Sequence, residues 1–177
     1  LHMVYGKENS YFFRIATEPR ELMPFLGGDG TLYECINKFV HNKAKQYSID
    51  KDMLMVKCSY ISKKEEDFFN EILFDLLFDE EYMSGNKILI ILEDFVKIFK
   101  FEMNELIEIL IGLTHINISI EPKEKDLFRS RNTFFPGSSY DSIYDFDTNK
   151  YDSEKHFFKL EINPEFLKAC MEIRKIK

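Results

Sequence analysis

The segment SYDSIYDFDTNKYDSE has the side chains best suited to hold a metal ion. It carries four aspartates among tyrosines, at Asp141, Asp145, Asp147 and Asp152. A calcium loop places carboxylates at fixed alternating positions, with a central glycine and a final glutamate. Asp145 and Asp147 match only two of those positions, so we interpret the segment as a polar loop. A metal-dependent enzyme that uses it is the weakest of three functional alternatives.

A basic segment, EPKEKDLFRSR, precedes the acidic one. A basic stretch with an aromatic side chain, here Phe128, can follow a phosphate backbone. Our candidates for DNA-backbone contacts are therefore Lys123, Lys125, Arg129 and Arg131. Three acidic residues lie among these four basic ones, which leaves a local net charge of +1. A plain surface loop is the alternative.

The sequence shows no grouping of a nucleophile with a base. His41, His115 and His156 have no companion at helical or strand spacing, and GGDG at Gly27 to Gly30 lacks the lysine of a phosphate-binding loop. We therefore predict a protein that is not an enzyme and that needs no metal or cofactor.

The composition predicts a globular chain of one domain. The 177 residues are 45% hydrophobic and 31% charged, with a net charge of −7, which argues against a protein that wraps polyanions. The three cysteines, Cys35, Cys58 and Cys170, show no metal-site spacing. Buried thiols in a reduced, cytoplasmic protein are the expected state.

The N-terminal residues predict neither a signal peptide nor a membrane anchor. We expect residues 1–10 to combine a cloning remnant, His2-Met3, with a flexible terminus, and residues 11–177 to form the single domain. The longest aliphatic run, Ile88 to Leu92, is far shorter than the roughly 20 residues of a membrane span.

A helix with a capping box begins at Ser62, where Glu65 follows three residues later. Its apolar residues recur with the helical period, and its outer face is acidic. A second helix is predicted in MNELIEILIGL, with Asn104 as its N-cap and Gly112 at its end. Further helices are predicted in TLYECINKFVHNKAKQYS, EDFVKIFKF and, after Asn163-Pro164, EFLKACMEIRK, which would bury Phe166, Leu167, Cys170 and Met171.

Strands are predicted in YFFRIA, KILIIL, THINISIE and HFFKLEI. THINISIE alternates without exception, with Ile116, Ile118 and Ile120 on one face. MLMVKCSY fits either a short strand or an extended link, and TEPRELMPFLGGDG reads as a turn region.

The order of these elements predicts an α+β fold, a winged helix-turn-helix with extra flanking helices. Its wing would be the long polar excursion between the strands at Thr114 and His156. An α+β fold with another arrangement of the same elements is the alternative. The DNA-reading helix would be FEMNELIEILIGL, which presents Glu102, Glu105 and Glu108. Carboxylates repel phosphate, so we expect this surface to face protein or water.

The chain resembles the first winged-helix domain of plasmid replication initiators, the Rep proteins that bind iterons. The matching segments are ISKKEEDFFNEILFDLL, LEDFVKIFKFEMNELIEILIGLTHINISIE and HFFKLEINPEFLKAC, similar in hydrophobic pattern. The resemblance implies a domain that dimerises and contacts DNA along its backbone, while a second domain beyond Lys177 reads the bases. The alternative is a free-standing winged-helix module or regulator that binds proteins.

The strand THINISIE is our candidate for the dimer interface. An alternating strand beside a long wing is expected near a sheet edge, where unpaired backbone groups can accept another chain. Its polar face, His115, Asn117 and Ser119, is uncharged. We therefore expect a homodimer with a sheet across or beside the interface.

Overall fold

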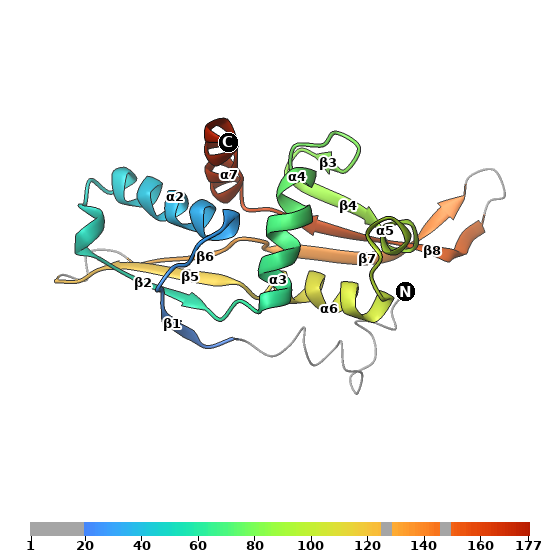
Figure 1. Ribbon diagram of the computed structural model, residues 1–177, viewed down its shortest axis with the longest axis horizontal. Helices are drawn as coiled ribbons and strands as arrows, with labels where there is room; N and C mark the ends of the chain where they lie inside the picture. The colour runs from blue at the N-terminus through green and yellow to red at the C-terminus, as the bar shows by residue number, and fades with distance from the viewer. Residues whose placement is uncertain (1–19, 125–128, 146–149) are drawn as a thin grey trace.

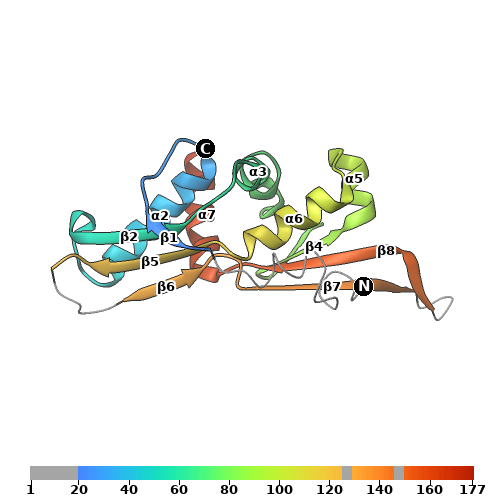
Figure 2. The ribbon, with the colours of Figure 1, turned by 90° about the horizontal axis from the view of Figure 1, so that it is seen from below.

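The computed structural model describes residues 20–124, 129–145 and 150–177. Two four-stranded antiparallel sheets support a layer of helices, and one continuous hydrophobic core runs between them (Figures 1 and 2). The predicted α+β class is confirmed. The strand predicted in YFFRIA lies outside the described residues.

Sheet A has the strand order β1-β2-β5-β6, comprising β1 (Leu22–Pro24), β2 (Leu54–Ser59), β5 (Asn117–Pro122) and β6 (Ser130–Thr133). The ambiguous segment MLMVKCSY is therefore a strand. The region predicted as a turn contains β1, because the backbone there pairs with β2 and the Phe25 N–H donates to the Val56 carbonyl at 2.9 Å. The alternation of β5 is confirmed by the burial of Ile118 and Ile120.

Sheet B has the order β3-β4-β8-β7, comprising β3 (Met83–Ser84), β4 (Lys87–Ile91), β8 (Lys150–Glu161) and β7 (Gly137–Asp145). The prediction of a long polar wing is wrong. Most of that excursion is β6, β7 and the start of β8, whose backbone groups pair with neighbouring strands. Phe134 and Phe135, between β6 and β7, are fully buried.

The helices are α2 (Thr31–Gln46), α3 (Lys63–Phe68), α4 (Phe74–Leu76), α5 (Leu92–Phe99), α6 (Met103–Leu113) and α7 (Pro164–Ile176), with a 3-10 turn at Lys51–Met53. A π-helical turn, Phe69–Leu73, joins α3 to α4. The predicted capping box is confirmed: Ser62 Oγ accepts from the Glu65 N–H at 3.2 Å, and Glu65 Oε1 accepts from the Ser62 N–H at 3.0 Å. The Asn163 cap of α7 is also confirmed.

Three details of the predicted helices are wrong. Glu102, not Asn104, is the N-cap of α6. Gly112 does not end that helix: it lies in the last turn, where an added Cβ would overlap the Glu65 carboxylate. In α7, Met171 is exposed and Leu167 half-buried, because the buried face of that helix runs through Phe166, Ala169, Cys170 and Ile173.

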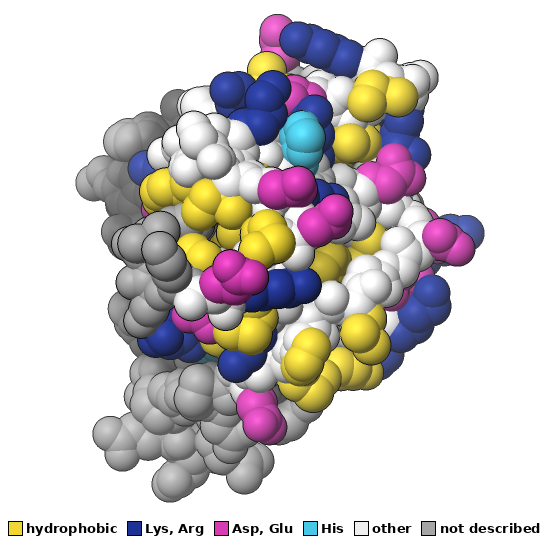
Figure 3. Space-filling view, turned by 90° about the vertical axis from the view of Figure 1, so that its left-hand side faces the viewer, with side chains coloured by type: hydrophobic (Ala, Val, Ile, Leu, Met, Phe, Trp, Pro, Cys, Tyr) yellow, Lys and Arg dark blue, Asp and Glu magenta, His cyan; other side chains and the backbone are white. Residues whose placement is uncertain are grey.

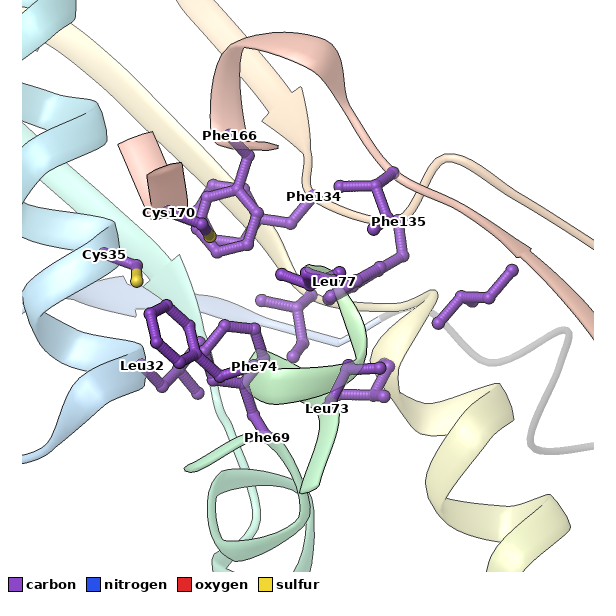
Figure 4. Close-up of a cluster of buried hydrophobic side chains, with 14 of the residues drawn as sticks. Leu32, Cys35, Phe69, Leu73, Phe74, Leu77, Phe134, Phe135, Phe166 and Cys170 are labelled. Carbon is purple, nitrogen blue, oxygen red and sulfur yellow. The ribbon is translucent and has the colours of Figure 1, made fainter. Parts of the chain in front are cut away.

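An aromatic cluster joins the helices to the point where the chain passes from sheet A to sheet B. Figure 4 shows Phe69 and Phe74 from the α3–α4 helix, Phe134 and Phe135, and Phe166 of α7 meeting there. Phe134 and Phe166 stack with centroids 4.1 Å apart. Cys35, Cys58 and Cys170 are all buried free thiols, as predicted.

The side chain of Asn70 caps α2 from a different helix. The N-cap position of α2 is Gly30, which has φ 117° and no side chain to accept a hydrogen bond. Asn70 Oδ1 accepts from the Leu32 N–H at 2.8 Å instead. The π-helical turn contains Asn70, so this turn presents the amide to α2.

We predict that Phe166→Ala lowers the free energy of unfolding by about 3–5 kcal/mol, because it leaves a cavity in the fully buried cluster. Urea titration, monitored by circular dichroism, measures the free energy of unfolding. Ile176→Ala, in the same helix but 78% exposed, is the control and should change stability by less than about 0.5 kcal/mol. Equal losses of stability in the two variants would contradict the placement of Phe166 in the buried cluster.

We also predict that Asn70→Ala costs about 1 kcal/mol, since the α2 N–H loses its acceptor. Asn104→Ala is the matched control, because Asn104 is exposed and caps nothing. Thermal unfolding of both variants checks this, and an unshifted midpoint for Asn70→Ala would rule out the cap.

Candidate nucleic-acid interface

The helix in the position of a DNA-reading helix, α6, has its apolar face in the core. In α6, Leu106, Leu110 and Leu113 have no solvent exposure, and the helix packs against α3 and α5. Arg20 bonds both Glu65 oxygens beside Gly112, with Nη1 2.6 Å from Oε1. The side of α6 that stays at least partly at the surface carries Glu102, Glu105 and Glu108, whose carboxylates repel phosphate.

The glutamates of α6 either pair with a neighbouring helix or lie at the exposed start of α6. Glu105 lies 3.7 Å from Lys64 of α3, and Glu102 is exposed at the start of the helix. These positions agree with a surface that faces protein or water.

The outer face of sheet A carries a row of polar side chains across its strands. Lys57 of β2 pairs with Ser119 of β5, which pairs with Arg131 of β6. Directly paired residues point to the same face, so two cations flank a hydroxyl, about 10 Å apart across two strand spacings. The helices gather on the other side of the sheets (Figure 2).

Lys57 was not among the residues singled out from the sequence. The alternation of side chains in MLMVKCSY could have identified it. If this segment is a strand, Lys57 faces away from the buried Leu54 and Cys58. The sequence left that segment unassigned, so the lysine could not be placed on a face.

The four basic candidates are only partly brought together. Arg131 is exposed on β6, and Lys123 is exposed just after β5, with its N–H bonded to the Met53 carbonyl. Arg129 pairs with Glu121 at 2.9 Å, which offsets part of its charge. Lys125 lies outside the described residues. Of the three that the structure describes, Arg131 and Lys123 are the cations best placed to meet a phosphate.

The surface at the end of the molecule formed by sheet A and α2 carries charges of both signs over its described residues. On the described part of this face, Lys and Arg side chains stand among acidic and hydrophobic ones (Figure 3). Contacts with phosphate there would involve a few side chains, not a continuous basic surface.

The reason for placing the dimer interface at THINISIE is wrong. The strand β5 is interior and pairs with β2 on one side and β6 on the other. The Asn117 N–H donates to Ser59 Oγ at 2.9 Å, and its Oδ1 accepts from Thr133 Oγ1 at 2.6 Å. The His115 carbonyl accepts from Ser59 Oγ, and Ser119 lies between paired strands. Strand addition therefore cannot use His115, Asn117 or Ser119.

The acidic segment is not a loop over its described residues. Asp141 and Asp145 belong to β7 and Asp152 to β8, while Asp147 lies outside the described residues. Across the described residues, no three His, Cys, Asp or Glu side chains are grouped so as to hold a metal ion.

Two side chains of types that can act as a base or a nucleophile, His156 and Cys58, are largely enclosed by the fold. His156, which looked isolated in the sequence, places Nδ1 3.1 Å from Glu93 Oε2 and stacks on Tyr140. Burial raises the pKa of the Cys58 thiol to about 11, so its nucleophilic thiolate is scarce at neutral pH.

Comparison with known proteins gives no relative: no family model, curated protein or solved structure matches the chain. Within the described residues, no helix has both the length and the apolar character to cross a membrane.

We predict that Asn117→Pro destabilises the fold by at least about 2 kcal/mol, because proline removes a bonded N–H from an interior strand. Asn117→Ala keeps that N–H and should cost only about 1 kcal/mol. Thermal unfolding compares the two. If Asn117→Pro kept the wild-type melting temperature, β5 would not be an interior strand.

Proposed function

We propose that this chain is a non-catalytic, winged-helix-type domain of a replication initiator. The order α3–α4, β4, α5, α6 and the hairpin β7–β8 supports this, because β8 pairs with β4 and the hairpin lies beside the helices. On this assignment the paired strands β7 and β8 take the place of the wing. The strands β5 and β6 are an insertion between α6 and the hairpin.

We infer that the domain contacts the DNA backbone through the outer face of sheet A and not through α6. The observation that carries this is the contrast between the glutamates on the accessible side of α6 and the two cations of the Lys57–Ser119–Arg131 row. Cations on a strand face can meet phosphates, but they carry no sequence information. Binding by this domain alone is therefore weak and independent of sequence.

A homodimer is also part of the proposal, since the resemblance to initiators implies pairing through the first domain. Because β5 is interior, the pairing surface must lie elsewhere. Sedimentation equilibrium at micromolar concentration tests the dimer, and a monomer throughout would refute it.

We predict that the chain binds a duplex of about 20 base pairs with a dissociation constant of about 10–100 μM near 50 mM salt. Lys57→Ala combined with Arg131→Ala should reduce the salt slope of log K by about 2, one for each lost phosphate contact. Fluorescence anisotropy at several salt concentrations measures the slope.

The control combines Lys45→Ala with Lys168→Ala, which removes the same charge from exposed positions on α2 and α7. It should leave the salt slope close to that of the wild type. Equal slopes for the two double variants, or no binding at low salt, would refute the proposed interface.

A further inference from the structure

A polar hollow lies on sheet B, where β4, β8 and β7 run side by side. Its volume is about 290 Å³, and its lining is Lys87, Gly137, Ser138, Ser139, Lys159 and Glu161. None of these residues belongs to the interface proposed on sheet A. Most of the lining is charged or carries a hydroxyl group, so the hollow suits a polar ligand.

Strand register places five of the lining residues on one face of sheet B. Glu161 of β8 lies opposite both Lys87 of β4 and Gly137 of β7, and Lys159 lies opposite Ser139. Directly paired residues point to the same face. The residues that alternate with the two lysines in β4 and β8 are fully buried, so the lysines point away from the core.

The two lysines are close together and have no anionic partner. Lys87 and Lys159 are diagonal neighbours on adjacent strands, a relation that separates Cα atoms by about 7–8 Å. Among the residues that the structure describes, no carboxylate forms a salt bridge with either of them. Two like charges at this separation repel each other, so an anion that contacts both is favoured.

The carboxylate in the lining is turned toward β7. Glu161 lies opposite Lys87, yet its Oε2 would be 2.8 Å from a Cβ added at Gly137. The carboxylate therefore lies over the glycine, which has no side chain, and not on the lysine. Ser139, opposite Lys159, places a hydroxyl donor beside that second cation.

Two ammonium groups and a hydroxyl on one face are donors that suit a phosphate group. The hollow is slightly smaller than the about 300–1,000 Å³ of most small-molecule pockets, so its ligand is compact. We propose that Lys87, Lys159 and Ser139 bind a phosphate group on the outer face of sheet B.

Two sources of phosphate fit this chemistry. The helices cover the other side of both sheets, so the hollow and the Lys57–Ser119–Arg131 row look to the same side of the molecule (Figure 2). A duplex bound along both sheets would supply the group from its backbone, and this source rests on the function proposed above. A free phosphate ester is the other source, and it needs no contact with sheet A.

Pyrophosphate is the probe for the site itself. Calorimetry on the whole chain near 50 mM salt should give a dissociation constant of about 1 mM. Lys87→Ala with Lys159→Ala should weaken this binding at least about tenfold, because both cations are lost. The control, Lys97→Ala with Lys175→Ala, removes the same charge from exposed positions on α5 and α7 and should leave the binding unchanged.

A gain of affinity separates a binding site from damage to the fold. Glu161→Gln should strengthen pyrophosphate binding about threefold, since it removes a negative charge from the hollow. Glu80→Gln makes the same change of charge at an exposed position outside the hollow and should have little effect. Melting curves confirm that each variant is folded. Unchanged affinity in Glu161→Gln, or equal losses in the two lysine pairs, would overturn the proposal.

The duplex of about 20 base pairs identifies the source. A salt slope of log K that falls by about 2 in Lys87→Ala with Lys159→Ala assigns the phosphate to the DNA backbone. An unchanged slope with lost pyrophosphate binding assigns it to a free phosphate ester. No effect of this variant on either measurement would overturn the site. Lys57→Ala with Arg131→Ala should leave pyrophosphate binding unchanged, so failure of the interface on sheet A is distinguishable from failure of this site.

Discussion

The contact between Phe134 and Phe166 fixes the relation between the two sheets. Phe134 follows β6, and Phe166 lies in the first turn of α7, shortly after β8. Their stacking therefore joins the end of the last strand of sheet A to the end of β8 in sheet B. The Asn163 N–H donates to the Phe134 carbonyl at 2.9 Å, and Asn163 Oδ1 caps α7. One asparagine thus connects the end of sheet A to the helix that follows sheet B.

The position of α6 follows from this arrangement. With both sheets held on one side, the helices share a single layer, and α6 lies between α3 and α5. Gly112 allows α6 to approach the Arg20–Glu65 pair, where any side chain would collide with the carboxylate. Glu65 is at once the capping-box residue of α3 and the partner of Arg20. A helix locked by such a pair is a structural element, whatever its place in the chain order.

Local signals predicted the elements that depend on their own residues. Ser62 and Glu65 form a cap within one turn, and the Ile118–Ile120 alternation needs only the core. Elements that depend on distant residues were missed: β1 exists because of β2, β7 because of β8, and the cap of α2 comes from Asn70. The proposed DNA interface could not be predicted for the same reason, because it also depends on distant residues. Arg131 was visible as a basic residue, but its pairing through Ser119 with Lys57 depends on strand register, which no local pattern encodes.

The net charge of −7 and a contact with phosphate are compatible because charges act locally. At physiological salt the screening length is about 8 Å, shorter than the roughly 10 Å between Lys57 and Arg131 across two strand spacings. In the proposed interface each of these cations would therefore interact with a phosphate largely independently of the other. The acidic α3–α4 face repels a duplex on the helix side, so the charges favour the contact along the sheet that we propose. The charge distribution thus selects an orientation more than it provides affinity, as a domain needs if another part of the protein reads the bases.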